Sequence, residues 1–160
     1  HVGITPEVSA EALSQFKSVK RRMERLGQFS GVSLYDDFAH HPTAIATTLD
    51  GLRKKVGKGK ILAILEPRSN TMKMGVHKST LAQSWQEADA VYLFEPANMD
   101  WSLRDVAAQS ETPTQCFDDV ETIVSIVSRV AEQGDHILIM SNGGFSGIHQ
   151  KLISALQEGL

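Results

Sequence analysis

The chain has 160 residues, of which 41% are hydrophobic and 22% are charged, a composition typical of one globular domain with its own core. The net charge of −3 does not indicate nucleic acid or an anionic membrane surface as a partner. No apolar run approaches the roughly 20 residues that span a bilayer, and we find no signal-peptide pattern. The single cysteine, Cys116, excludes an internal disulfide and a cysteine-rich zinc site, and it fits a cytoplasmic location. Because the chain begins with His1, we expect it to be a piece of a longer protein.

The chain alternates between strand-like and helix-like segments after an opening helix. Thr5 as N-cap and Pro6 at the first helical position begin this helix, which we expect to end near Val19. We then expect strands at 21–26, 32–35, 61–65, 90–94, 114–117 and 136–140. We expect the remaining helices at 43–56, 78–88, 102–108, 118–132 and 147–157.

This alternation predicts an α/β fold, with a Rossmann-like, mostly parallel sheet and helices on both faces. The uninterrupted apolar run 61–65 is typical of a parallel strand that is covered on both sides. The segments 21–26 and 32–35 should form a hairpin that adds an antiparallel edge. Thr43 can cap the helix at 43–56, and Asp118 can cap the helix at 118–132.

The most informative stretch, residues 35–43, reads Tyr-Asp-Asp-Phe-Ala-His-His-Pro-Thr between a strand and a helix. Ligands of open α/β sheets bind at the carboxyl ends of strands, where helix N-termini favour anions. One carboxylate of Asp36 and Asp37 could bind ribose hydroxyls or position a metal-bound phosphate, and the alternative is an N-cap or a solvated turn. His40 or His41 could face a ligand or cap the helix. We predict no metal site, because no Cys or Glu nearby completes a zinc spacing.

Three further segments are candidates for ligand contact. Arg21 and Arg22 could bind a phosphate, although exposed arginine pairs are usually only solvated. The polar loop 66–75 carries cations suited to a carboxylate. The glycine-rich turn 141–147 could bring backbone N–H groups to an anion, or it could be a tight connection only. The chain has neither a phosphate-binding P-loop nor a dinucleotide fingerprint, and we interpret Trp85, Trp101 and Cys116 as packing residues.

These strings together resemble the C-terminal domain of the Mur ligases. The string D-D-[YF]-x-H-x-P corresponds to residues 36–42, and R-R-[FM]-[DE] corresponds to residues 21–24. The strings 66–77 and 141–149 are most similar to members that add a tripeptide. The alanine-adding member has Q-P-H-R-Y-T-R-T in the first of these loops. The sequence differs from that loop at Arg68, Ser69, Asn70, Met72 and Lys73.

The resemblance implies that residues 1–160 are one domain of a three-domain, ATP-dependent, ADP-forming amide ligase of peptidoglycan recycling. The N-terminal domain would hold a UDP-sugar, and the central domain would hold the P-loop and Mg²⁺. The expected reaction joins L-alanyl-γ-D-glutamyl-meso-diaminopimelate to UDP-N-acetylmuramate through an acyl phosphate. The alternatives are a UDP-N-acetylmuramate–L-alanine ligase domain and a non-catalytic nucleotide- or peptide-binding module.

The resemblance also implies roles for individual residues. Arg22 matches the family arginine near the interdomain hinge and the γ-phosphate, so we expect it to act in catalysis and to contact ATP. Asp37 and His40 match the nucleotide-side residues. The residues expected to bind the amino substrate are Arg68, Ser69, Asn70, Lys73, His77, Asn142, Gly143 and Gly144.

Overall fold

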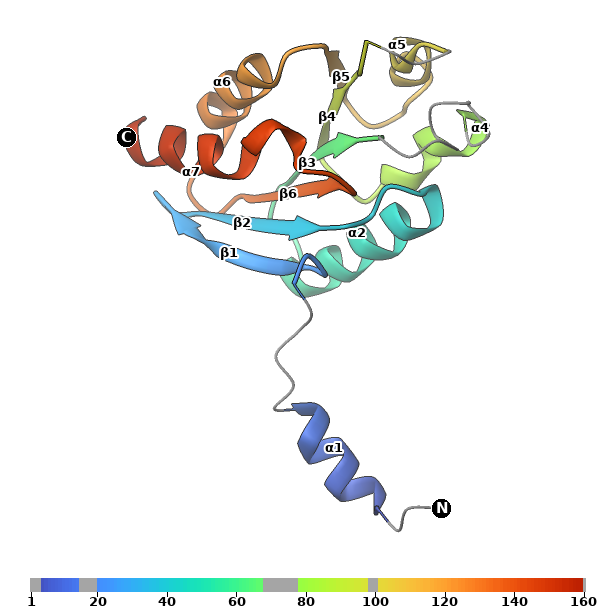
Figure 1. Cartoon of the computed structure of the whole chain (residues 1–160), viewed down its shortest axis with the longest axis vertical. Coiled ribbons are helices and arrows are strands. Elements are labelled where there is room, and N and C mark those ends of the chain that lie inside the picture. Colours follow the sequence, from blue (N-terminus) through green and yellow to red (C-terminus); the bar gives the residue numbers. More distant parts are fainter. Residues whose placement is uncertain (1–3, 15–19, 68–77, 98–100, 160) are drawn as a thin grey trace.

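A computed structural model of the chain describes residues 4–14, 20–67, 78–97 and 101–159 (Figure 1). Its strands are β1 (Glu24–Phe29), β2 (Val32–Asp37), β3 (Ile61–Glu66), β4 (Ala90–Phe94), β5 (Thr114–Phe117) and β6 (His136–Ser141). Its α-helices are α1 (Pro6–Ser14), α2 (Pro42–Val56), α4 (Lys78–Leu81), α5 (Leu103–Ala107), α6 (Val120–Val130) and α7 (Ile148–Glu158). Two 3₁₀ turns are η1 (Ala82–Trp85) and η2 (Phe145–Gly147).

The strands form one sheet in the order β1-β2-β6-β3-β4-β5. β1 pairs with β2 antiparallel, and every other neighbouring pair is parallel, which confirms the predicted Rossmann-like fold and its edge hairpin. Every residue of β3 is buried, as its apolar run predicts. The register places Asp37 beside Met140 and Glu66 beside Ser141. The polar residues that end these strands therefore meet at one edge.

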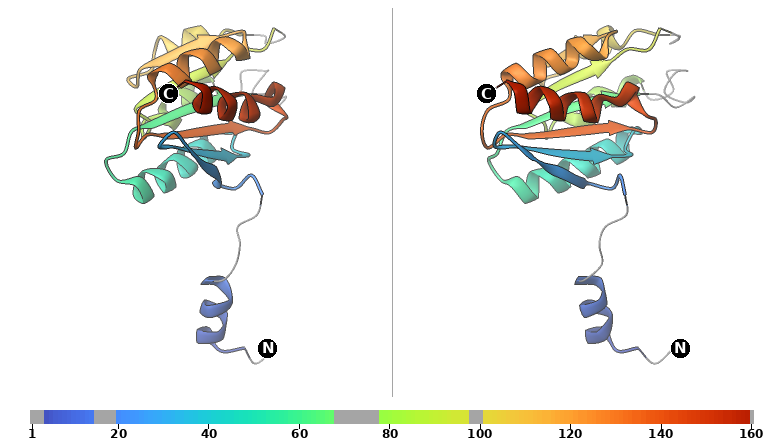
Figure 2. Two further views of the ribbon diagram at one scale, coloured as in Figure 1. Left: turned by 90° about the vertical axis from the view of Figure 1, so that its left-hand side faces the viewer. Right: turned by 60° about the vertical axis from the view of Figure 1, so that its left-hand side comes forward.

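Helices cover both faces of the sheet (Figure 2). On one face, α2, η1 and α5 bury residues such as Leu49, Trp85 and Leu103 against the sheet. On the other face, α6 and α7 bury residues such as Ile123 and Leu152. The helices that follow β2 and β6 therefore lie on opposite faces of the sheet.

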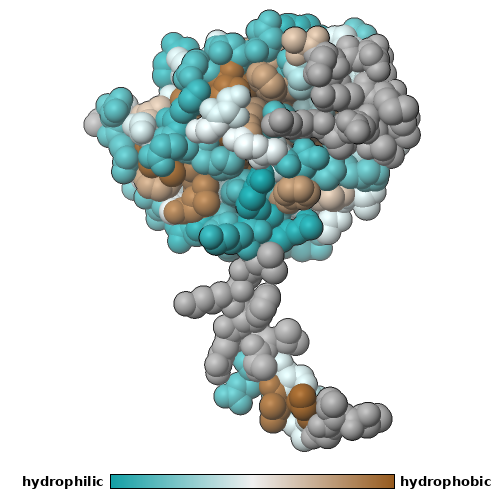
Figure 3. Space-filling view, viewed as in Figure 1, coloured by the Kyte–Doolittle hydropathy of each residue, from teal (hydrophilic) through white to brown (hydrophobic). Residues whose placement is uncertain are grey.

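Helix α1 lies apart from the sheet (Figure 1). Ile4, which precedes this helix, and Val8, which lies within it, are both exposed. Figure 3 shows the apolar surface of this part of the chain. The expected continuation of the helix towards Val19 falls on residues outside the described ranges. In the described parts of the chain, no helix is both long enough and apolar enough to cross a membrane.

Two predicted helix caps are wrong by one or two positions. The cap of α2 is His41 rather than Thr43, because Pro42 occupies the first helical position and keeps the residue before it extended. The Thr43 amide then donates to His41 Nδ1 over 3.3 Å. The cap of α6 is Asp119 rather than Asp118, because its carboxylate accepts from the Thr122 amide at 2.8 Å. The helix expected at 78–88 ends at Trp85 in a 3₁₀ turn.

Candidate functional site

The candidate site lies where β2 and β6 end. Their following helices, α2 and α7, pass to opposite faces of the sheet, and in open α/β folds ligands bind at such a switch point. β2 ends in Asp36 and Asp37, and β6 ends in Ser141. All three are at most 5% exposed. A buried polar group requires a hydrogen-bond partner, so the partners of these side chains define the site.

Asp36 joins three segments of the chain. Its Oδ2 accepts from Arg21 Nε at 3.1 Å, and its Oδ1 accepts from His149 Nε2 at 2.9 Å. The same arginine donates through Nη2 to the Ser141 carbonyl oxygen at 2.5 Å. The turn before β1, the ends of β2 and β6, and the first turn of α7 are thereby connected by charged hydrogen bonds, which are stronger than neutral ones.

Asp37 holds the backbone around it. Its Oδ2 accepts from the Met23 amide at 2.7 Å, and its Oδ1 accepts from the Ala39 amide at 2.7 Å. The Thr48 hydroxyl donates to the same Oδ1 at 3.4 Å. Both carboxylate oxygens therefore have partners within the domain, and these bonds fix the positions of the chain before β1 and after β2.

Arg22 is presented by a strained turn. Its neighbours Arg21 and Met23 have φ angles of 56° and 48°, in the left-handed region that costs a residue other than glycine about 1–3 kcal/mol. The turn is held by the amide of Phe38, which donates to the Arg21 carbonyl oxygen at 2.9 Å. The exposed Arg22 places its guanidinium carbon 5.8 Å from the centre of the Phe38 ring. Surrounding contacts therefore maintain an unfavourable backbone that places one cation at the site.

The two histidines have different surroundings. His41 caps α2, so the structural alternative holds for that imidazole. His40 Nδ1 lies 3.0 Å from the Phe38 carbonyl oxygen, which can accept a hydrogen bond from it. The His40 ring meets the Phe38 ring edge-on, with centroids 5.6 Å apart. His40 and Arg22 therefore both lie against Phe38.

The turn after β6 contributes a second group of polar atoms. The Ser141 hydroxyl donates to Glu66 and accepts from the Gly143 amide at 2.9 Å. Asn142 Oδ1 is buried and has no hydrogen-bond partner among the residues that the structure describes. Phe145 and Ser146 then adopt left-handed conformations that turn the chain into α7. An unpaired buried acceptor is unfavourable by itself, and a ligand that donates a hydrogen bond would satisfy it.

The structure brings together six of the predicted site residues: Arg22, Asp37, His40, Asn142, Gly143 and Gly144. The loop residues Arg68, Ser69, Asn70, Lys73 and His77 lie outside the described residues. Sequence reasoning assigned no role to Phe38, Glu66, Ser141 or His149. These four residues lie within the motif strings. Their contacts could not be predicted, because those contacts depend on the register of β2, β6 and β3.

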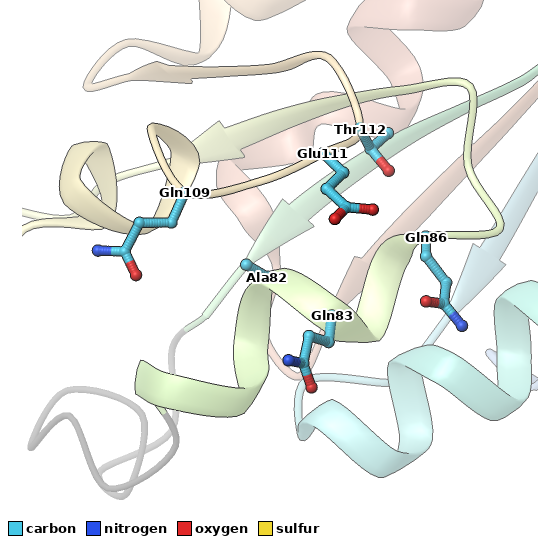
Figure 4. Close-up of a pocket in the computed structure, with 6 residues that line it drawn as sticks. All are labelled: Ala82, Gln83, Gln86, Gln109, Glu111 and Thr112. Carbon is cyan, nitrogen blue, oxygen red and sulfur yellow. The ribbon is translucent and has the colours of Figure 1, made fainter.

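Other polar features lie away from this edge. A pocket of about 490 Å³ is lined by Ala82, Gln83, Gln86, Gln109, Glu111 and Thr112 (Figure 4). Several of these residues precede β4 or β5, so the pocket lies towards the start of those strands. Burial and the nearby carboxylate of Glu95 raise the pKa of the Cys116 thiol to about 12. Within the described ranges, no three His, Cys, Asp or Glu residues are grouped to hold a metal ion.

The fold is that of a Rossmann-like α/β domain, and the candidate site lies at a switch point of its sheet. A model of the family "Mur ligase, glutamate ligase domain" matches residues 21–143, and the chain belongs to this family. The matched range includes both the turn that carries Arg22 and the strand that ends in Asp37.

Full-length relatives are about three times longer than the chain. It is 52% identical, over 99% of its length and 35% of the relative, to the Escherichia coli UDP-N-acetylmuramate–L-alanyl-γ-D-glutamyl-meso-2,6-diaminoheptandioate ligase. The crystal structure of a murein peptide ligase from Psychrobacter arcticus is similar, with 45% identity and a TM-score of 0.82 over 98% of this chain and 34% of that one. A crystallised domain of a Haemophilus ducreyi ligase, whose name contains the same tripeptide, is 47% identical to this chain, with a TM-score of 0.72. That match covers 84% of this chain and 99% of the other.

Proposed function

We propose that this chain is the C-terminal domain of an ATP-dependent, ADP-forming ligase. The ligase would join L-alanyl-γ-D-glutamyl-meso-diaminopimelate to UDP-N-acetylmuramate during peptidoglycan recycling in the cytoplasm. The observation that carries the proposal is the bond between the Met23 amide and Asp37, which joins the two family strings at the switch point. The similarity to the E. coli ligase supports the choice of substrates.

In the proposed reaction, the UDP-muramoyl carboxylate attacks the γ-phosphate of ATP and releases ADP. The amine of the tripeptide then attacks the acyl phosphate, forming the amide and releasing phosphate. Phosphoryl transfer depends mainly on positioning and on neutralising charge. The exposed guanidinium of Arg22 can supply positive charge at the phosphates, and His40 would lie on the same nucleotide side.

The rest of the nucleotide site would come from the central domain. The chain has no P-loop, and its described part has no cluster of metal ligands. We therefore propose that Mg²⁺ is bound mainly by that domain, and that this chain by itself does not hydrolyse ATP. Asp37 would act on the nucleotide side by holding the turn that presents Arg22, because both of its oxygens accept bonds from the domain itself.

The tripeptide would bind between the loop 66–77 and the turn after β6. We propose contacts from Arg68, Ser69, Asn70, Lys73 and His77 in the loop, and from Asn142, Gly143 and Gly144 in the turn. The unpaired Asn142 Oδ1 supports this assignment, because the amide and ammonium groups of a peptide are hydrogen-bond donors.

The test is phosphate release by the full-length protein with ATP, Mg²⁺ and UDP-N-acetylmuramate, with either the tripeptide or L-alanine added. Release with the tripeptide and little with L-alanine is the expected result. The reverse would identify an alanine ligase and show that the loop 66–77 does not select the tripeptide. Release with neither would leave a non-catalytic binding module. Phosphate release by the isolated 160 residues would contradict the proposed division between domains.

The loop is tested in the same assay with Arg68→Ala and Lys73→Ala. Each variant removes a cation suited to a substrate carboxylate, and a hydrogen bond to a charged group contributes roughly 1.5–3 kcal/mol. The expected result is a raised KM for the tripeptide with little change in the KM for ATP. An unchanged tripeptide KM in both variants would remove the loop from the binding site.

A further inference from the structure

We propose that Phe38 is a positioning residue that holds Arg22 and His40 in one arrangement. The inference rests on the proposed function, because it assumes that these two side chains act at the nucleotide. Phe38 comes directly after the buried strand β2, yet it is 37% exposed. Its ring is therefore not enclosed in the core, and it is available for contact with the polar side chains around it.

The backbone of Phe38 connects both neighbours. Its amide donates to the Arg21 carbonyl oxygen at 2.9 Å, which ties it to the turn that carries Arg22. Its carbonyl oxygen lies 3.0 Å from His40 Nδ1. One residue thus bonds to the turn on one side and to the imidazole on the other.

The ring of Phe38 makes three polar-aromatic contacts. The guanidinium carbons of Arg21 and Arg22 lie 5.3 Å and 5.8 Å from the ring centroid, within the range of a cation–π attraction. The His40 ring approaches edge-on, at an interplanar angle of 89°. Edge-to-face geometry of this kind is favourable between aromatic rings.

These contacts restrain the Arg22 side chain, whose position the backbone alone does not determine. The left-handed residues Arg21 and Met23 fix the main chain around Arg22 but not its long side chain. A guanidinium that rests beside an aromatic ring loses less freedom on meeting a phosphate, which is the benefit of preorganisation. An aliphatic side chain at position 38 has no π face and cannot replace this interaction.

The experiment compares Phe38→Leu with Phe38→Tyr in the full-length enzyme. The leucine variant removes the ring, and the tyrosine variant is the matched control that keeps it. We expect the leucine variant to lower kcat/KM for ATP by roughly two- to fivefold, the size of one exposed cation–π contact. The KM for the tripeptide and the melting temperature should change little in either variant, because the ring is partly exposed. Wild-type kcat/KM for ATP in the leucine variant would overturn the proposal.

A double-mutant cycle separates positioning from a general structural effect. In an Arg22→Gln background, Phe38→Leu should cost clearly less than it does alone, because the cation of this contact is already absent. Additive losses would overturn the proposal.

A measurement that does not depend on catalysis tests the positioning role of Phe38 separately from the proposed function. The crystallised Haemophilus ducreyi domain indicates that a domain of this kind folds by itself. In the isolated 160 residues, the NMR signals of the Arg22 guanidinium and the His40 imidazole should shift in Phe38→Leu and stay near wild type in Phe38→Tyr. Unchanged signals in the leucine variant would overturn the positioning role. A full-length protein without ligase activity would instead overturn the proposed function.

Discussion

Arg21 and Asp36 form an ion pair with an Nε–Oδ2 distance of 3.1 Å at the carboxyl edge of the sheet. The side chains of Asp36 and Arg21, taken without their backbone, are 7% and 31% exposed, so water screens the pair only in part. Because the same guanidinium bonds to the Ser141 carbonyl oxygen, the pair also holds β6 beside β2. The pair therefore links the stability of the domain to the shape of the candidate site.

Arg21→Ala should destabilise the domain by about 1–3 kcal/mol, because Asp36 loses its arginine partner while it stays buried and keeps only the hydrogen bond to His149. Urea unfolding of the variant measures this free energy. The matched control is Arg25→Ala, which removes only long contacts from an exposed side chain on β1. Equal stability losses in the two variants would show that the ion pair with Asp36 stabilises the domain no more than the long contacts of Arg25 do.

Trp85→Ala should cost about 3–5 kcal/mol, the usual cost of removing a fully buried aromatic side chain. The indole N–H also donates to the Ser110 hydroxyl at 2.8 Å. Trp101→Ala is the comparison, because that residue is only partly buried against the same core. Thermal unfolding should show a much larger fall in melting temperature for the first variant, and similar falls would contradict the assignment of the core.

The domain should lose stability as the pH falls below about 6.5, partly through His136. Burial is the main cause that lowers the pKa of this imidazole from 6.5, and Arg25, Lys55 and Arg53 lower it further, while Asp135 opposes them. A lowered pKa means that the unfolded chain binds the proton more readily, so protonation favours unfolding.

The check is the free energy of unfolding measured between pH 7.5 and pH 5.5 for the wild type and His136→Gln. The variant should show a shallower dependence on pH, because its side chain does not titrate. Identical pH profiles would mean that His136 is not desolvated in the folded state.

Cys116 should react slowly with thiol reagents in the folded domain. Burial and Glu95 raise the pKa of its thiol from 9.0 to about 12, which lowers the thiolate fraction at pH 8 roughly a thousandfold. Labelling with a disulfide reagent in buffer and in urea measures the difference, and the unfolded chain is the control. Fast labelling of the folded domain would contradict the partly buried position of this sulfur beside Glu95.

Local patterns were sufficient to predict most of the fold. The apolar run 61–65 and the spacing of Val120, Ile123, Val124 and Val127 confirm that burial follows the period of a strand or a helix. The helix caps were less predictable. His41 caps α2 because a proline follows it, and Asp119 caps α6 because its side chain reaches Thr122, so one position decides which residue accepts the bond.

The sequence by itself determined the succession of strands and helices along the chain, the alternation of buried and exposed faces, and the motif strings of the family. These features depend on neighbours within a few residues, so the local sequence specifies them. Only the tertiary structure decided that Arg21 and His149, far apart in the chain, share the carboxylate of Asp36. It also decided that Asp37 binds the turn before β1 and that Arg22 and His40 both contact the ring of Phe38. Such contacts depend on the order and register of strands, which long-range packing fixes and no local pattern contains.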